Sequence, residues 1–176
     1  MANFLYIQSQ FNLAYISLAS WEAEKMLDLS GQKFLAKAEG TKYTAYLDSV
    51  GIWTIGRGII EYEDGKPVRK GDTITADREI ALFNNTVKKY VNNVNKKVTS
   101  KINQNQFNAL VSLCYNIGIT GFNNSTLLKK VNKNPNDPTI RNAFASWKYG
   151  TIRGKKQVIK GLVNRRKAEA DLYFQK

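Results

Sequence analysis

The 176-residue chain contains no histidine, and this absence excludes several kinds of active site. Ser-His-Asp and Cys-His systems use an imidazole as their general base. Zinc sites built on histidine are excluded as well, and a single cysteine cannot replace those ligands. We therefore expect no metal centre. A general acid near neutral pH must be a carboxyl group with a raised pKa, or a Lys, Tyr or Cys with a lowered one.

The one cysteine, Cys114, excludes an intramolecular disulfide, so the fold must be stable without one. Cys114 lies in the mainly apolar run 109–115. A thiol in such a run is more often a buried, unreactive core residue than a nucleophile, because only an accessible thiolate reacts. We predict the buried role.

Acidic residues are few: 14 Asp and Glu stand against 27 Lys and Arg, which gives a formal net charge of +13. A basic surface of this size attracts polyanions such as nucleic acid, anionic lipid or an anionic bacterial cell wall. The cations are spread along the chain, with local pairs such as Lys96-Lys97 and Lys155-Lys156. This distribution is typical of a solvated face, and it favours general electrostatic attraction to an anionic cell envelope over one specific patch.

Residues 1–28 contain neither glycine nor proline, and their apolar residues recur in steps of three and four. The segment lacks the basic amino-terminal region of a secretory signal, and polar residues interrupt its apolar character. We predict a packed amphipathic helical extension over 1–29, with export or membrane association as the alternative. Its apolar face would comprise Phe4, Ile7, Phe11, Tyr15, Leu18 and Trp21.

Residues 30–176 are expected to form one domain, without internal repeats or linkers. Its first half should contain a helix over 31–39 capped by Ser30 and ended by Gly40, strands over 44–47 and 52–55 joined by a turn at 49–51, and a helix over 76–98 capped by Thr75. Its second half should contain a helix after Asn103 or Asn105, a loop over 117–124, helices over 125–133 and 139–149, a basic loop over 150–161 and a helix over 162–174.

One stretch, 39–58, brings together residues that suit hydrolysis. Glu39 would stand at the end of a helix and face a hairpin that carries Asp48 and Thr54. Cleavage of a glycosidic bond needs an acid for the leaving oxygen and polar groups that hold a water. Two carboxylates and a hydroxyl around one gap meet that need. The alternative for Glu39 taken alone is an ordinary solvated glutamate.

The same stretch carries the first of several motifs that follow one another along the chain. With these motifs, the sequence from about residue 29 to its end resembles the phage-type lysozymes, the endolysin family of the bacteriophage T4 enzyme, and in particular its lambdoid-phage branch. Each motif is weak alone, but the ordered set is specific. The motifs are Glu39-Gly40, Ala45-Tyr46-x-Asp48, Gly51-x-Trp53-Thr54-Ile55-Gly56-x-Gly58, Gln104-x-Gln106-Phe107-x-Ala109-Leu110, Asn116-x-Gly118, Gly121-Phe122, Ser125-Thr126-Leu127-Leu128 and Gly161-Leu162-x-x-Arg165-Arg166-x-x-Glu169.

The resemblance implies an α+β, lysozyme-like fold. A small β-hairpin lobe, about 40–75, would be joined by the helix of about 76–98 to a larger helical lobe, 99–176, with the active-site cleft between them. The implied activity is a glycoside hydrolase that cleaves the β-1,4 bond between N-acetylmuramic acid and N-acetylglucosamine in bacterial peptidoglycan, as a monomer without a cofactor. It would stay in the host cytoplasm until lysis and act on the cell wall or periplasm.

By the same resemblance, Glu39 would donate a proton to the glycosidic oxygen. Asp48 and Thr54 would hold the water that attacks the opposite face of the sugar, which inverts the anomeric centre. Arg165 would pair with Glu39 and position it.

Three further residues, Tyr115, Asn116 and Ser125, fall where the family lines its sugar-binding cleft. Tyr115 as a core residue and Ser125 as a helix cap are open alternatives. Ile59 stands where relatives usually have a histidine that pairs with an acidic group. We expect this difference to affect stability and its pH dependence more than the chemistry.

Two other functions are alternatives to the lysozyme. The first is a non-catalytic wall-binding or phage structural module on the same fold, and the intact set of Glu39, Asp48 and Thr54 argues against it. The second is a basic nucleic-acid-binding protein. No recognised binding motif is present, so that hypothesis depends on charge alone, and we expect no specific nucleic acid as partner.

Overall fold

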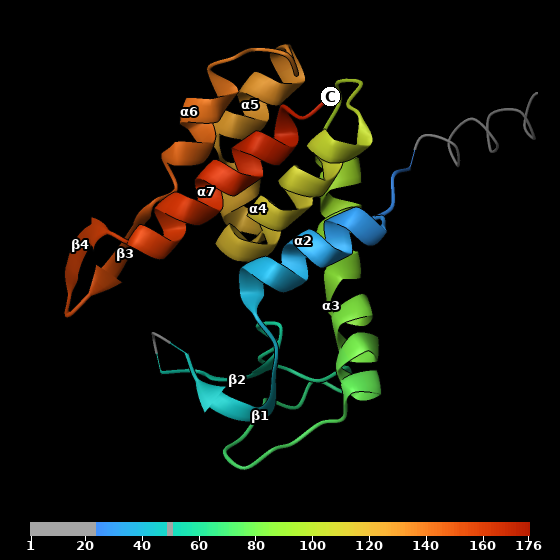
Figure 1. The fold of residues 1–176 in the computed structure, drawn as a ribbon, viewed down its shortest axis with the longest axis vertical. Coiled ribbons are helices and arrows are strands. Elements are labelled where there is room, and N and C mark those ends of the chain that lie inside the picture. The colour runs from blue at the N-terminus through green and yellow to red at the C-terminus, as the bar shows by residue number, and fades with distance from the viewer. Residues whose placement is uncertain (1–23, 49–50) are drawn as a thin grey trace, which may run out of the picture.

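The computed structural model describes residues 24–48 and 51–176. Most of the predicted amino-terminal helix and of the predicted turn at 49–51 lies outside the described residues. Residues 24–28 are described and are not helical. Within the described ranges, six helices and two separate antiparallel hairpins make an α+β fold, as predicted. Figure 1 shows a small lobe that contains β1 and β2, a larger body of helices, and α3 running from one to the other.

Helix α2, Leu29–Glu39, positions the candidate acid at its last residue. The predicted cap, Ser30, is wrong: Asp28 caps the helix, and its carboxylate accepts a 2.8 Å hydrogen bond from the Gly31 N–H. Gly40 ends the helix as predicted, with a φ of 70° that favours glycine. An added Cβ at Gly31 would lie 2.6 Å from atoms of Asn108, so α2 packs directly against α4 at this point.

The small lobe is built on strands β1, Lys42–Leu47, and β2, Trp53–Gly56, which pair antiparallel near the predicted positions. Its core is a cluster of four buried aliphatic residues, Ile55, Ile59, Val68 and Leu82. Ile59 is almost fully buried, with 1% of its surface exposed. The position that usually holds histidine in relatives is therefore part of an apolar core in this chain.

Helix α3, Ala76–Lys97, connects the two lobes. Thr75 caps it as predicted, accepting a hydrogen bond from the Arg78 N–H. Leu82 packs in the core of the small lobe, whereas Phe83 and the valines after it belong to the core of the large lobe. One helix thus contributes side chains to both cores and connects the two lobes rigidly.

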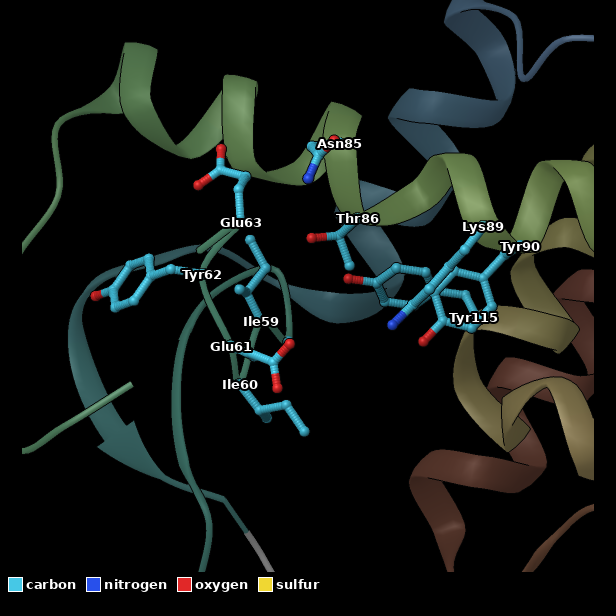
Figure 2. Close-up of a pocket in the computed structure, with 11 residues that line it drawn as sticks. Ile59, Ile60, Glu61, Tyr62, Glu63, Asn85, Thr86, Lys89, Tyr90 and Tyr115 are labelled. Atoms are coloured by element: carbon cyan, nitrogen blue, oxygen red, sulfur yellow. The ribbon is translucent and has the colours of Figure 1, made fainter. Parts of the chain in front are cut away.

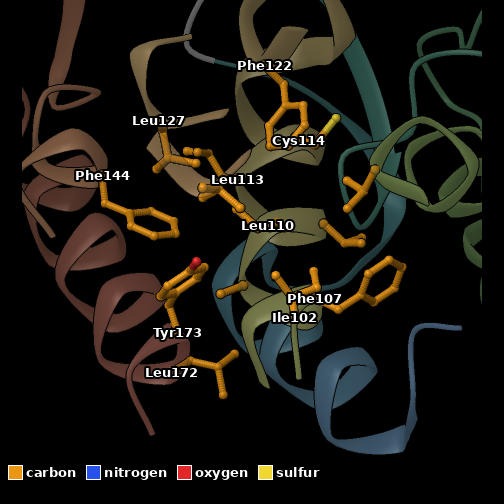
Figure 3. Packing of buried hydrophobic residues seen from close by; sticks show 14 of the residues in the cluster. Ile102, Phe107, Leu110, Leu113, Cys114, Phe122, Leu127, Phe144, Leu172 and Tyr173 are labelled. Atoms are coloured by element: carbon orange, nitrogen blue, oxygen red, sulfur yellow. The ribbon is translucent and has the colours of Figure 1, made fainter. Parts of the chain in front are cut away.

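The large lobe surrounds helix α4, Gln104–Asn123, which Asn103 caps through a reciprocal capping box with Gln106. The predicted loop over 117–124 is wrong. The chain kinks at Gly118, where φ is 81° and ψ is 159°, and then resumes the helix and buries Phe122. Figure 3 shows side chains of α4 packing against those of α5, α6 and α7.

Cys114 lies in this core, fully buried, as predicted. Burial raises the pKa of its thiol to about 12, and a hydrogen bond from the Asn93 side chain opposes that shift. The thiol is therefore protonated and unreactive near neutral pH.

The carboxy-terminal third contains α5, Thr126–Lys133, α6, Ile140–Ala145, and α7, Lys160–Tyr173. The predicted helix over 139–149 is too long, since α6 ends at Ala145. The predicted basic loop over 150–161 is also wrong. It contains an antiparallel hairpin of β3, Tyr149–Ile152, and β4, Lys155–Val158.

The turn between these strands explains the hairpin. Arg153 and Gly154 both have positive φ, 50° and 75°, the combination required in the two-residue turns whose twist matches a β-hairpin. Among the described residues, Arg153 is the only non-glycine with positive φ. No described helix is long and apolar enough to span a bilayer.

Candidate active site

Glu39 ends α2 with its side chain mostly buried, 15% exposed, and its Oε1 lies 2.7 Å from Nη1 of Arg165 on α7. The contact predicted between these two residues is therefore present. Gly40 turns the chain away immediately after Glu39, with its N–H bonded to the Ala36 carbonyl. The acid is thus presented at a helix end and held from a helix that is distant in sequence.

Arg165 is shared between two carboxylates. Its Nε lies 3.1 Å from Oε1 of Glu169, and its Nη2 donates to the Ser112 carbonyl at 3.3 Å. Glu169 is fully buried and also receives the Ser112 hydroxyl at 2.7 Å and Arg166 at 2.9 Å. Burial raises the pKa of Glu169, and both arginines oppose the shift. The four side chains Glu39, Arg165, Arg166 and Glu169 form a balanced set of two cations and two acids.

Asp48 and Thr54 both bond to the backbone of one residue, Ile52. The Ile52 N–H donates to the Asp48 carboxylate at 2.9 Å, and the Ile52 carbonyl accepts from the Asp48 N–H at 3.0 Å. The same carbonyl accepts the Thr54 hydroxyl at 3.0 Å. Thr54 is 3% exposed, so its hydroxyl is held by packing as well. The β1–β2 hairpin therefore presents the second acid and the hydroxyl together.

Tyr46 lies near both candidate acids. It pairs with Thr54 across β1 and β2. Burial raises the pKa of Tyr46 first, and the negative charges of Glu39 and Asp48 raise it further. Both carboxylates therefore lie within electrostatic reach of the phenol.

Gly58 brings the backbone of the small lobe against Glu39. A Cβ at this position would lie 3.5 Å from the Glu39 Oε2 and 3.8 Å from the Tyr115 ring, and φ is 83°. Glycine is favoured here both by its positive φ and by this close approach. Tyr115 on α4 donates its hydroxyl to the Arg57 carbonyl at 2.6 Å, which ties the large lobe to the residue next to Gly58.

The side chain of Arg57 anchors this turn to α3. It forms a 3.0 Å ion pair with the buried carboxylate of Glu79, and its guanidinium lies over the Phe83 ring, 4.3 Å from the centroid. Burial raises the pKa of Glu79, and Arg57 opposes the shift. The turn 56–58 is thus fixed through both its side chain and its backbone.

A cavity of about 280 Å³ opens beside Gly58 and Tyr115. Figure 2 shows Asn85, Thr86, Lys89 and Tyr90 of α3 on one side of it, and the segment 59–63 on the other. Gly58 both lines the cavity and contacts Glu39, so the candidate acid adjoins a hollow between the lobes. Polar groups on an apolar floor are typical of binding pockets.

Two of the other residues predicted to bind sugar have partners in the protein. Asn116 is exposed, and its side-chain oxygen accepts a 2.9 Å hydrogen bond from Arg166. Ser125 is 4% exposed; its hydroxyl donates to the Phe122 carbonyl and accepts from the Leu128 N–H. These contacts favour the capping interpretation for Ser125. Tyr115 combines both alternatives, because it packs on Tyr90 and also lines the cavity.

Sequence reasoning missed several residues of the site. Glu169 stands three and four residues after Arg166 and Arg165, a helical spacing that indicates ion pairs. Tyr46 lies inside a motif used for the resemblance and had no role assigned. No sequence pattern indicated the ion pair of Arg57 and Glu79, because the two residues are 22 positions apart and meet only through tertiary packing. In the described parts of the chain, no three His, Cys, Asp or Glu side chains group to hold a metal ion.

Comparison with known proteins agrees with this geometry. Residues 36–169 match the Phage lysozyme family. The endolysin of Salmonella phage P22 is 37% identical over 140 residues, which cover 80% of this chain and 92% of the relative. The SAR-endolysin of Enterobacteria phage P21 is 34% identical over 134 residues, 76% of each chain.

A solved structure, the endolysin from Escherichia coli O157:H7 phage FAHEc1, superimposes with a TM-score of 0.80 and 41% identity. That likeness covers 85% of this chain and 94% of the other. The family match spans both the acid at the end of α2 and the network on α7. The chain therefore belongs to the phage lysozyme family, whose endolysins are lysozyme-type hydrolases that degrade peptidoglycan.

Proposed function

We propose that the protein hydrolyses the β-1,4 bond between N-acetylmuramic acid and N-acetylglucosamine in peptidoglycan, with Glu39 as general acid. The observation that supports this most directly is the placement of Glu39. Its carboxylate lies 2.7 Å from the guanidinium of Arg165 and against Gly58, which lines the cavity. A positioned carboxyl beside a hollow suits proton donation to a leaving oxygen.

Arg165 orients Glu39, and the positive charge of its guanidinium is partly neutralised by a second carboxylate. Glu169 is buried against the same guanidinium and compensates much of its charge. Glu39 then delivers its proton to the glycosidic oxygen as the bond breaks. The sugar left behind acquires positive charge at its anomeric carbon, which the carboxylates stabilise.

Asp48 and Thr54 hold the attacking water. The Asp48 carboxylate accepts hydrogen bonds, and the Thr54 hydroxyl, which donates to the Ile52 carbonyl, keeps its lone pairs as acceptors. Both side chains are held by the backbone of Ile52, which fixes their relative positions. Attack from the face opposite to Glu39 inverts the anomeric centre.

The test is release of reducing ends from purified peptidoglycan by wild type and by Glu39→Gln, with mass spectrometry of the products to identify the bond cut. We expect the variant to fold normally and to lose on the order of 100-fold or more in rate, since general acid catalysis contributes about that much. Glu61→Gln is the matched control, because Glu61 is an exposed carboxyl that lines the same cavity. Equal rates for Glu39→Gln and wild type would refute the assignment of the acid.

We also propose that the protein acts as a monomer, is made in the host cytoplasm and acts on the cell wall at lysis. Several relatives are named SAR-endolysins, so an export role for the amino-terminal segment is a hypothesis alongside a packed helix. Fractionation of cells that express the full chain, or the chain without residues 1–23, tests it. Loss of the protein from the envelope fraction on truncation would favour export.

A further inference from the structure

The hairpin of β3 and β4 is the most exposed element of the large lobe. Figure 1 shows it extending away from the helices, just before α7. All four residues of β4 and three of the four in β3 are exposed. A two-stranded hairpin with both faces in water is marginal by itself, so its composition is informative about a partner.

The hairpin lies in a strongly basic segment. Residues 138–168 contain no Asp or Glu, and nine Lys and Arg. Five of these cations stand on the hairpin or at its borders, and in the part of the chain that the structure describes none of the five forms an ion pair. They are Lys148, Arg153, Lys155, Lys156 and Lys160.

Apolar side chains accompany these charges. Tyr149, Ile152 and Val158 are 47%, 47% and 51% exposed. Tyr149 and Val158 are direct cross-strand partners, so they lie on the same face, whereas Ile152 lies on the other face beside the turn. The ammonium groups of Lys148 and Lys156 lie 5.7 and 4.9 Å from the centre of the Tyr149 ring. Cations therefore flank an exposed aromatic and aliphatic pair.

The combination of cations with exposed apolar side chains distinguishes between two kinds of anionic partner, a soluble polyanion and a lipid bilayer. A soluble polyanion is attracted by the cations alone and gains nothing from exposed aliphatic groups. At a bilayer surface, in contrast, apolar side chains enter the headgroup boundary while lysine and arginine reach the phosphates. We propose that the β3–β4 hairpin is a docking surface for an anionic phospholipid bilayer. Docking of this kind is peripheral, and it is independent of the proposed hydrolysis.

The test is co-sedimentation of the full chain with vesicles that contain phosphatidylglycerol, and with vesicles of phosphatidylcholine only. We expect binding to the anionic vesicles alone. Each cation near an anionic leaflet strengthens binding about fivefold, so the variant Arg153→Gln, Lys155→Gln, Lys156→Gln should bind on the order of 100-fold more weakly. The variant Tyr149→Thr, Ile152→Thr, Val158→Thr keeps strand propensity and should lose at least about tenfold.

The matched control is Lys96→Gln, Lys97→Gln, Lys101→Gln, which removes the same charge from exposed positions at the far end of α3. We expect it to bind almost as wild type. An equal loss in the control and in the hairpin charge variant would overturn the proposal, because general charge would then explain the binding. An unaffected apolar variant would also overturn it and indicate a purely electrostatic polyanion surface. Urea unfolding of both hairpin variants at the denaturant concentration that unfolds the wild type would show that each is folded.

Discussion

Single side chains at the site are held by more than one neighbour, and Thr54 is a clear case. Its hydroxyl donates to the Ile52 carbonyl, which also accepts the Asp48 N–H. Removing the hydroxyl therefore leaves that carbonyl satisfied. Under the proposed mechanism, a large effect on rate would therefore come from the lost contact to the attacking water and not from misfolding.

Thr54→Val tests this reading, since valine keeps the shape of the buried side chain. We expect the rate of reducing-end release to fall on the order of 100-fold, while the free energy of unfolding changes by about 1 kcal/mol or less. The rate is measured with purified peptidoglycan, and the free energy of unfolding is measured by urea unfolding of the protein. A variant with near-normal rate would remove Thr54 from the proposed mechanism.

Cys114 affects stability through its protonation. Burial raises the pKa of its thiol from 9.0 to about 12, so folding favours the protonated form. This stabilisation is fully present below the unfolded pKa and is lost as pH rises from about 9 towards 12, because the unfolded chain ionises first.

For wild type, the free energy of unfolding should fall from pH 8 to pH 10 by about 1 kcal/mol more than for Cys114→Ala. Urea unfolding at the two pH values measures both slopes, and the comparison cancels the contribution of buried tyrosines. Parallel slopes for the two proteins would show that the thiol does not titrate differently in the folded state.

At the scale of elements, the network around Arg165 joins three helices. Arg165 and Glu169 come from α7, Ser112 from α4 and Glu39 from α2. A guanidinium can satisfy all three at once through its planar donors, whereas an ammonium cannot. The network therefore positions Glu39, because it holds α2 and α7 in a fixed arrangement against α4.

Arg165→Lys should therefore cost about 2 kcal/mol in stability and lower the rate of hydrolysis about tenfold. The control is Lys167→Gln on the same helix, which breaks an exposed ion pair with Asp171 and should cost less than about 1 kcal/mol. Thermal unfolding and reducing-end assays give both quantities. Similar losses in the two variants would mean that the network has no special role.

The elements also show where reasoning from sequence succeeds. Periodicity and turn residues predicted α2, α3, α5 and the β1–β2 hairpin, because each is specified by its own residues, although Asp28 and not Ser30 caps α2. The kink in α4 was missed because Gly118 looks like a helix end, and the burial that resumes the helix through Phe122 is tertiary. The β3–β4 hairpin was missed because its turn uses Arg153, which is an unusual residue for positive φ.

The same contrast holds within the site. Glu39, Asp48 and Thr54 lie within sixteen residues, so the single stretch 39–58 predicted them together. The contacts of Glu39 with α7 and of Arg57 with Glu79 depend on how distant segments pack, which local pattern does not encode. The pairing of Arg165 with Glu39 was anticipated from the family resemblance and not from the chain alone.

At the scale of the whole molecule, the candidate acid and the residues proposed to hold the water come from different lobes. Glu39 is fixed to the large lobe through Arg165, whereas Asp48 and Thr54 belong to the small lobe. Helix α3 and the hydrogen bond from Tyr115 to the Arg57 carbonyl hold the two lobes in register. A substrate between the lobes would be protonated on one face and attacked by water on the other.

The anomeric configuration of the first product, followed by NMR during cleavage of purified peptidoglycan, tests this arrangement most directly. If the bond cut is the proposed β-1,4 bond, attack by a water held at Asp48 and Thr54 releases the new reducing end first as the α anomer. Initial release of the β anomer would mean a retaining reaction, and it would contradict the division of roles between Glu39 and the β1–β2 hairpin.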